Sequence, residues 1–294
     1  MMTEAVVFNG QGSEFAGMGN FLYQESLIFK ENIDAADACL DFDLPGYLFS
    51  PAPLAAQPDK LQPALVAYMV ALYRATQRQP ARLLGLSLGE YAALIAGGML
   101  PLAAGLELVQ IRGQAMAAAC RTNPGGMLAL RLKTPDQAQP LLELPEVWLA
   151  NRNAPTQLVL GGTSAGLEAA RARARELGIK ALPLKVAGAF HTPLMAPAQA
   201  RLHQALSAAP WQAGERPVFS TTTQQLFTPQ TVVATLTAQV ATQTDLAQSV
   251  ALTIAAGIDQ MIEIGPRPVL AKAIGKQGAT VLSISDATSL KGDA

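Results

Sequence analysis

Short blocks of apolar residues alternate along this chain with longer stretches of mixed apolar and polar residues. The short blocks, such as Ala5–Phe8, predict buried β-strands, and the longer stretches predict helices. Strands that alternate with helices of about ten to twenty residues favour an α/β architecture. Within the first 122 residues the predicted strands are 5–8 and 81–84, and the predicted helices are 21–38, 61–79, 90–97 and 101–120.

A different order begins after Arg121, where the turn cluster Thr122–Gly126 is followed by strand, helix, strand, strand, helix and strand. This βαββαβ order is that of a ferredoxin-like unit, and we interpret it as an insert in a larger α/β domain. We therefore expect a large, hydrolase-like catalytic domain with a parallel sheet, made of residues 1–122 and 190–294, and a small subdomain of residues 123–189. The predicted strands of the insert are 127–132, 147–150, 157–160 and 179–186, and its helices begin at 134 and 164.

Composition and charge exclude several classes of protein. Half of the 294 residues are hydrophobic and only 15% are charged, which suits a compact globular enzyme. The net charge of −1 gives no basic field for nucleic acid. No apolar stretch reaches about 18 residues and the N-terminus has no signal-peptide pattern, so we expect a cytoplasmic protein without a membrane span. The two cysteines, Cys39 and Cys120, have no Cys or His at metal-ligand spacing, so no metal or cofactor is expected.

The stretch Gly85-Leu86-Ser87-Leu88-Gly89 has the G-x-S-x-G pattern of a serine nucleophile. A four-residue predicted strand precedes it and an apolar helix follows, which is the context in which a sharp turn exposes the serine hydroxyl. The N-terminal N–H groups of that helix would point at an anion formed beside Ser87. A Gly-Ser loop that only caps the helix is the alternative.

A serine nucleophile needs a base, and the chain has only two histidines. His203 lies inside a predicted helix, whereas His191 lies in a loop between a strand and a helix, where α/β folds present reactive groups. His191 is therefore the candidate base, with capping of the following helix as its alternative role. No carboxylate between Ser87 and His191 follows a strand of the large domain, so a backbone carbonyl is left to orient the imidazole.

Arg112 lies on the largely apolar face of its predicted helix, without an acid three or four residues away. A buried guanidinium without a partner is costly, so the position indicates an anionic ligand. A side chain that reaches out to solvent explains the pattern equally well. The turn Gly10-Gln11-Gly12 lacks the third glycine of a dinucleotide loop, but its N–H groups could donate to an oxyanion.

Seven segments in order along the chain resemble the malonyl-CoA:acyl carrier protein transacylases and the related acyltransferase domains of polyketide synthases. Together they span nearly the whole chain and are far more specific than the serine motif alone. The segments are GQGSEFAGMG (Gly10–Gly19), LQPAL (Leu61–Leu65), GLSLGEYAAL (Gly85–Leu94), QIRGQAM (Gln110–Met116), NRNAPTQLVLGG (Asn151–Gly162), AFHTPLM (Ala189–Met195) and IEIGPRPVL (Ile262–Leu270).

The resemblance implies malonyl transfer from malonyl-CoA, through an ester on Ser87, to the phosphopantetheine thiol of an acyl carrier protein. His191 would be the general base, and a monomer would suffice. The resemblance also implies the remaining roles: Gln11 and Leu88 for the oxyanion hole, Arg112 for the malonyl carboxylate, Phe190 for acyl selection and Gln239 for orientation of His191.

One departure from the family lies beside the nucleophile, where Leu86 stands in place of a histidine and makes the pocket wall more apolar. A serine esterase, which would release the acyl group to water, and a non-catalytic acyl-CoA-binding module are the rival classes. Fatty-acid synthesis is the commonest setting for such a chain, and a polyketide cluster or a malonate decarboxylase system would need a nearly identical catalyst.

Overall fold

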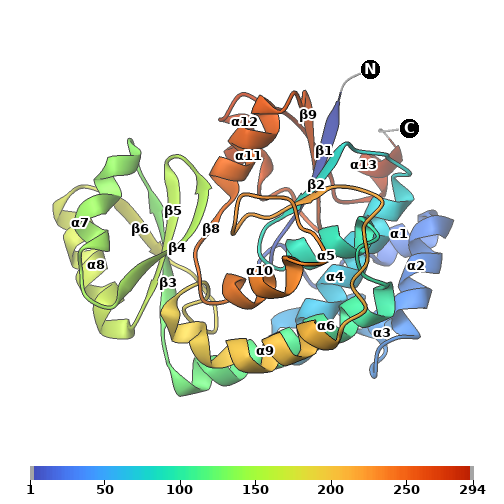
Figure 1. Ribbon diagram of the computed structural model, residues 1–294, viewed down its shortest axis with the longest axis horizontal. Coiled ribbons are helices and arrows are strands. Elements are labelled where there is room, and N and C mark those ends of the chain that lie inside the picture. The colour runs from blue at the N-terminus through green and yellow to red at the C-terminus, as the bar shows by residue number, and fades with distance from the viewer. Residues whose placement is uncertain (1–2, 292–294) are drawn as a thin grey trace.

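The computed structural model describes residues 3–291, without the side chains of residues 56 and 58, and has two lobes (Figure 1). The larger lobe is built on a five-stranded sheet in the order β10-β9-β1-β2-β7, in which all neighbours are parallel. The predicted fold class, a large parallel-sheet domain with a smaller mixed α/β unit, is confirmed. The strands are β1 (Glu4–Phe8), β2 (Arg82–Gly85), β7 (Val218–Phe219), β9 (Gln260–Ile264) and β10 (Thr280–Ile284).

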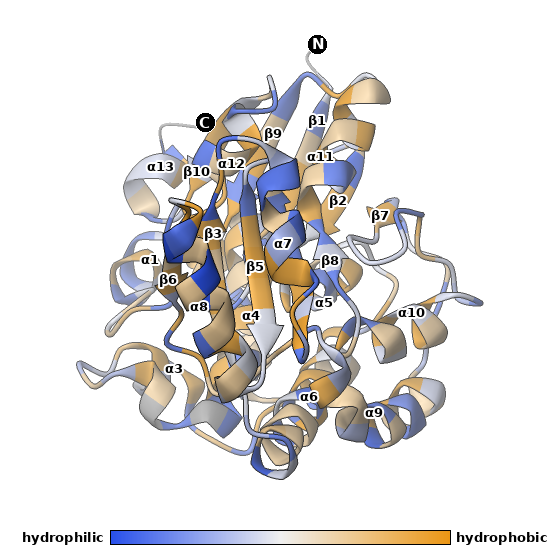
Figure 2. Ribbon diagram, turned by 90° about the vertical axis from the view of Figure 1, so that its left-hand side faces the viewer, coloured by the Kyte–Doolittle hydropathy of each residue, from blue (hydrophilic) through white to orange (hydrophobic). Residues whose placement is uncertain are grey.

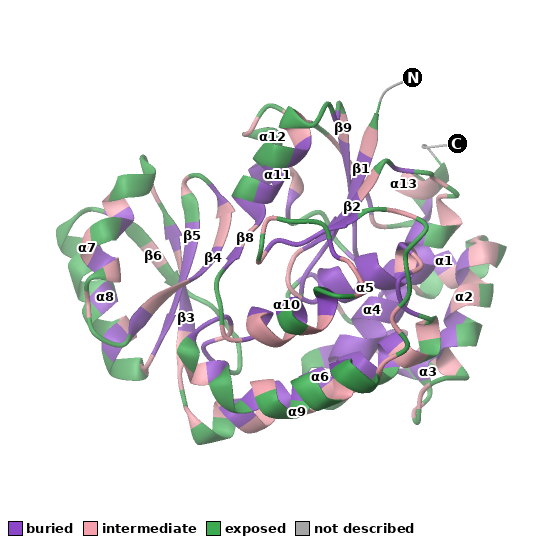
Figure 3. Cartoon of the chain, viewed as in Figure 1, coloured by how far each residue is buried: buried purple, intermediate pink, exposed green. Residues whose placement is uncertain are grey.

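Both faces of the parallel sheet are covered, as parallel sheets require. Along β1, Val6 and Phe8 face the larger core, whereas Ala5 and Val7 face a smaller core beneath α11 and α12. In Figure 3 the helices α4 and α5 are almost wholly buried between the sheet and the outer helices. The larger core is formed by α1 (Asn20–Glu25), α2 (Leu27–Asp37), α3 (Leu44–Leu48), α4 (Pro58–Ala75), α5 (Gly89–Ala96), α6 (Leu102–Thr122), α9 (Ala196–Ala208), α10 (Val232–Gln239) and α13 (Ala287–Lys291), and the smaller by α11 (Leu246–Ala255) and α12 (Ala271–Gly275).

The smaller lobe has a second sheet in the order β6-β3-β5-β4-β8. Its first four strands are antiparallel and carry the strand order of a ferredoxin-like unit, with α7 and α8 on one face (Figure 2). The fifth strand, β8, comes from the larger lobe and pairs in parallel with β4. The residue limits of the two domains stay a prediction. The elements are β3 (Gly126–Arg131), α7 (Gln139–Leu142), β4 (Val147–Ala154), β5 (Gln157–Gly162), α8 (Ser164–Glu176), β6 (Lys180–Pro183) and β8 (Thr244–Asp245).

Several elements differ in length from the sequence-based prediction. The helix predicted over 61–79 is α4, which begins at Pro58 because a proline fits the first turn, and which ends at Ala75. The strand predicted over 179–186 ends at Pro183, and residues 184–186 leave the sheet to line a pocket. The strand predicted over 147–150 continues to Ala154 through two register shifts. No helix within residues 3–291 is long and apolar enough to cross a membrane.

Candidate active site

Ser87 occupies the turn between β2 and α5 in a left-handed backbone conformation, with φ of 55°. The two flanking glycines allow the turn because the chain passes close to both. A Cβ on Gly85 would lie 2.0 Å from the carbonyl carbon of Gly89, and a Cβ on Gly89 would lie 2.4 Å from the carbonyl oxygen of Phe8. Positive φ is unfavourable for a residue with a side chain, and such strain is typical of functional turns. The serine is thus presented at the carboxyl edge of the sheet.

The loop that contains Gln11 lies beside this turn because β1 and β2 are adjacent parallel strands, with Phe8 in register with Gly85. Both Gln11 and Leu88 line the pocket that contains Ser87. Among the described residues, no acceptor engages the backbone N–H of either Gln11 or Leu88. Two free N–H groups near a serine are the donors that an oxyanion hole needs.

His191 lies 104 positions from Ser87 in the chain, and the structure brings their side chains into contact. Its Nε2 is 2.7 Å from Ser87 Oγ, and its Nδ1 donates to the backbone carbonyl of Gln239, 2.8 Å away. The carbonyl can only accept, so Nδ1 holds the proton and Nε2 offers its lone pair to the serine hydroxyl. This carbonyl closes the C-terminus of α10, whose negative dipole end favours a cationic imidazole. His203 is exposed and contacts Thr237.

Burial, and then the positive charge of Arg112, lower the pKa of His191 to about 4. A lowered pKa leaves the imidazole neutral, and therefore able to accept a proton, at every pH above that value. We expect the titration of His191 to appear as a rise in kcat/KM for acylation of Ser87 with a midpoint near pH 4, because this parameter reports the free enzyme. Single-turnover acylation measured from pH 3.5 upward tests this, and a midpoint at the ordinary histidine value of about 6.5 would contradict it.

Arg112, on α6, is fully buried, so the alternative in which it reaches solvent is wrong. Its Nη1 donates to Gln62 Oε1 at 2.9 Å, and its Nη2 donates to Ser87 Oγ at 3.0 Å and to Gln239 Oε1 at 3.2 Å. Its Nε is buried and has no acceptor among the described residues. The guanidinium therefore lies beside the Ser87 hydroxyl and has an N–H donor without a partner among residues 3–291, as a site for a carboxylate requires.

Glu90, to which the sequence patterns assigned no role, is a fully buried carboxylate that contacts Gln239 behind this constellation. Its Oε2 accepts from Gln239 Nε2 at 2.5 Å, and its Oε1 accepts from the N–H and the hydroxyl of Thr221 at 2.5 and 2.9 Å. Burial raises the pKa of Glu90 to about 7, against the opposing effect of these hydrogen bonds. Its signal in the sequence is an acid on an otherwise apolar helix directly after the serine turn.

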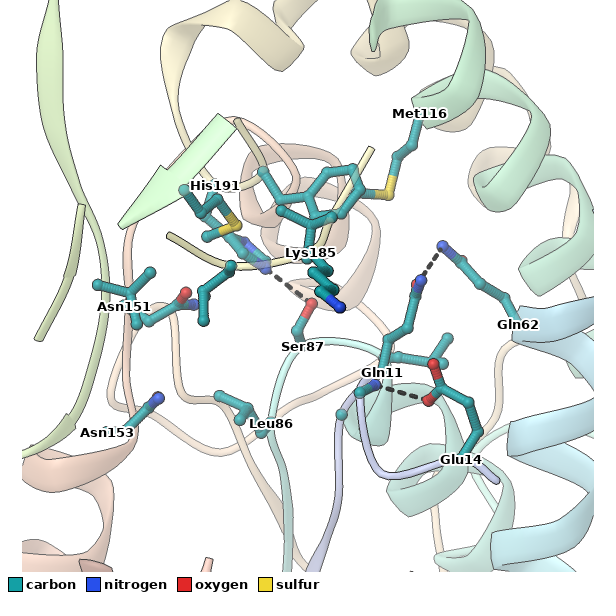
Figure 4. Close-up of a pocket in the computed structure, with 18 of the residues that line it drawn as sticks. Gln11, Glu14, Gln62, Leu86, Ser87, Met116, Asn151, Asn153, Lys185 and His191 are labelled. Carbon is teal, nitrogen blue, oxygen red and sulfur yellow. Dashed lines mark hydrogen bonds between the residues drawn. The ribbon is translucent and has the colours of Figure 1, made fainter. Parts of the chain in front are cut away.

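The pocket around Ser87 is lined by both apolar and polar side chains (Figure 4). Leu86 and Phe190 belong to the apolar lining, together with the methionines of α6 and β3. On β4, Asn151 and Asn153 point to the same side of the strand and line the pocket, and the buried Oδ1 of Asn153 has no donor within the described part of the chain. The sequence patterns predicted no role for these two asparagines. The apolar lining residues are Leu86, Met116, Met127, Val159, Leu184, Val186 and Phe190.

All the residues predicted for the site line this pocket or contact a residue that does. Ser87, His191, Arg112, Gln11, Leu88 and Phe190 line it, and Gln239 lies beneath Ser87 and Arg112. Lys185 also lines it, in front of Ser87 (Figure 4). Within residues 3–291 no group of three or more His, Cys, Asp or Glu side chains could hold a metal ion.

Known proteins match this chain over nearly its whole length. The model of the acyl transferase domain family matches residues 5–291. A malonyl CoA-acyl carrier protein transacylase of Bacillus subtilis is 34% identical over 292 residues, which cover 96% of this chain and 92% of that protein. A solved structure of MCAT from Streptococcus pneumoniae has a TM-score of 0.91 at 35% identity, and the match covers 99% of this chain and 98% of that one. Another solved relative, a malonyl-transacylase in complex with its type II PKS acyl-carrier protein, has a TM-score of 0.90 at 27% identity, and the match covers 99% of this chain and 98% of that one.

Proposed function

The chain belongs to the malonyl-CoA:acyl carrier protein transacylase family of acyltransferases, and from this premise we propose that its own transfer proceeds through a malonyl ester on Ser87. One observation carries the proposal: Ser87 Oγ lies 2.7 Å from His191 Nε2 and 3.0 Å from Arg112 Nη2. A nucleophile, its base and a group that binds carboxylates thus meet at a single oxygen. A binding module would not need the first two in contact.

In the first half of the reaction, the hydroxyl proton of Ser87 passes to His191 Nε2 as Oγ attacks the thioester carbon. The N–H groups of Gln11 and Leu88 hold the oxyanion of the tetrahedral intermediate, an interaction that contributes about 3–4 kcal/mol per donor in serine enzymes. The C–S bond then breaks, and the proton on Nε2 passes to the departing sulfur of coenzyme A. A malonyl ester remains on Ser87.

In the second half, the thiol of a phosphopantetheine arm gives its proton to His191 Nε2 and attacks the ester carbon. The C–O bond breaks, and the proton returns to Ser87 Oγ. Arg112 holds the malonyl carboxylate throughout, so that the acyl group stays in register with both acceptors. The apolar lining residues, Leu86 and Phe190 among them, limit how much space is left beside the malonyl methylene.

Mass spectrometry of the intact protein tests this proposal. After incubation with malonyl-CoA, we expect a malonyl adduct on the peptide that contains Ser87, and we expect it to disappear when a phosphopantetheinylated carrier protein is added. An adduct that clears equally fast in water alone would indicate an esterase. No adduct under either condition would contradict the proposal.

The setting of the reaction is also part of the proposal. We propose that the enzyme supplies malonyl groups to fatty-acid synthesis in the cytoplasm, and that it needs no cofactor beyond the coenzyme A and phosphopantetheine of its substrates. The curated relatives, which are malonyl CoA-acyl carrier protein transacylases, support the pathway. The side chains at the site support the lack of a further cofactor, because a base, an oxyanion hole and a cation account for every step above.

A further inference from the structure

We propose that Glu90 is a positioning residue for malonyl transfer, which acts by fixing the side-chain amide of Gln239 and, through it, the guanidinium of Arg112. Glu90 lies three positions after Ser87, on the first turn of α5, and has no exposed surface. It does not line the pocket and touches no group that would contact substrate. The inference rests on the proposed function, since it concerns how the carboxylate of the malonyl group is held.

The side-chain carboxylate of Glu90 accepts hydrogen bonds from Thr221 and Gln239, and a hydrogen bond with the side chain of Ser220 also favours its charged form. The backbone N–H and the hydroxyl of Thr221 donate to Oε1, and the side-chain amide of Gln239 donates to Oε2. An ionised carboxylate is an acceptor only, whereas a carboxylic acid would have to donate one hydrogen bond. These donors therefore favour the anion, which predominates above the pKa of about 7 to which burial raises the Glu90 carboxyl.

The side-chain amide of Gln239 forms hydrogen bonds through both its NH2 group and its oxygen, and the two groups have different partners. Its Nε2 donates both to Glu90 and to the backbone carbonyl of Ser87, 3.1 Å away, and its Oε1 accepts from Arg112 Nη2. Rotation of the amide by half a turn would place its NH2 against the donors of Arg112 and its oxygen against the carboxylate. The charge on Glu90 thus selects the orientation in which the oxygen faces Arg112.

The same residue also carries the backbone carbonyl that orients His191. A displaced Gln239 would therefore affect both the base and the guanidinium. The negative charge of Glu90, one amide away from Arg112, further offsets a buried positive charge that has no direct carboxylate partner among residues 3–291. Without that balance, a buried guanidinium is costly to keep in place.

A purely structural role is the competing explanation, because Glu90 also ties α5 to the segment that follows β7 through Thr221. The two explanations differ in what they predict for substrate choice. Loss of the hydrogen bonds between α5 and the segment after β7 would lower the stability of the protein and would reduce the transfer of all acyl groups alike. Misplacement of Arg112 penalises malonyl, which has a carboxylate, far more than acetyl, which has none.

The variant Glu90→Gln keeps the size of the side chain and removes its charge. Its carboxamide oxygen is needed by the N–H of Thr221, so its NH2 turns toward Gln239 Nε2 and the two donors repel. We expect the ratio of malonyl to acetyl kcat/KM in Ser87 acylation to fall about ten- to a hundredfold, the range of one hydrogen bond to a charged group. Adduct formation by the wild-type protein, measured in parallel, separates failure of this inference from failure of the proposed function.

Thr221→Val is the matched control, because it removes one hydrogen bond to Glu90 and leaves the contact with Gln239 intact. We expect its malonyl-to-acetyl ratio to match that of the wild type, even where its melting temperature falls. Glu90→Asp is the second variant in case Glu90→Gln does not fold: its shorter carboxylate withdraws from Gln239, and the ratio should fall in the same direction. A folded Glu90→Gln or Glu90→Asp protein with the wild-type ratio would overturn the proposal, as would a fall of the same size in Thr221→Val.

Discussion

Ser87→Ala should abolish transfer, with a loss of about 10⁴- to 10⁶-fold in kcat and no malonyl adduct on the protein. Removal of the nucleophile from a serine enzyme typically costs this much, because the remaining groups still bind the substrate and polarise its carbonyl. Binding should survive, since Arg112 and the backbone N–H groups of Gln11 and Leu88 are untouched. Quenched-flow transfer assays, with binding of malonyl-CoA followed by calorimetry, measure both quantities.

Ser164→Ala is the matched control for this variant. Ser164 also lies shortly after a strand and begins a helix, but it is exposed on the small lobe, and we expect full activity. The combined variant Ser87→Ala with His191→Ala should be no slower than Ser87→Ala alone, because the two side chains act as one unit. A malonyl adduct that persists in Ser87→Ala would place the nucleophile elsewhere and contradict the mechanism.

The elements that sequence patterns predicted well are those that depend on local chemistry. The turn at Ser87 could be predicted because its flanking glycines are needed by the turn itself, where the chain passes within about 2 Å of the absent Cβ atoms. His191 followed from its loop position and from the lack of another suitable histidine. The strand β8 could not be predicted, because Thr244 and Asp245 form a strand only by pairing with β4 across the lobes.

The hydrogen-bond network around Ser87 and His191 could not be predicted for the same physical reason. The partner of His191 Nδ1 is a backbone carbonyl 48 positions away. Every residue has a backbone carbonyl, so the residue type at that position does not reveal the contact. The sequence was compatible with a buried or a solvent-exposed Arg112. Its burial follows from the packing of α6 against its neighbours. The sequence marks Glu90 only as an acid on an apolar helix, because its hydrogen-bond partners, Thr221 and Gln239, are distant in the chain.

Arg112→Ala should reverse the acyl preference of the enzyme. We expect malonyl acylation to fall by about 2–5 kcal/mol, the cost of removing one partner from a buried, hydrogen-bonded charge pair, while acetyl acylation is largely spared. The reason is that only malonyl brings a carboxylate into the pocket, and without the guanidinium this charge is buried unpaired. Competition between malonyl-CoA and acetyl-CoA for Ser87, read by mass spectrometry, measures the preference directly.

The pH profile of acylation is a second measurement, which separates loss of the contact between Arg112 and the malonyl carboxylate from general damage to the site. The charge of Arg112 is one of the two causes that lower the pKa of His191, so its removal should move the midpoint of the acylation profile upward from about 4, toward the ordinary histidine value. Arg112→Lys keeps the charge and loses the two-pronged geometry, so its midpoint should stay low while its malonyl preference still falls. Intact malonyl transfer in a folded Arg112→Ala protein would show that the carboxylate is held by another group. An unmoved midpoint would show that burial alone keeps the base neutral.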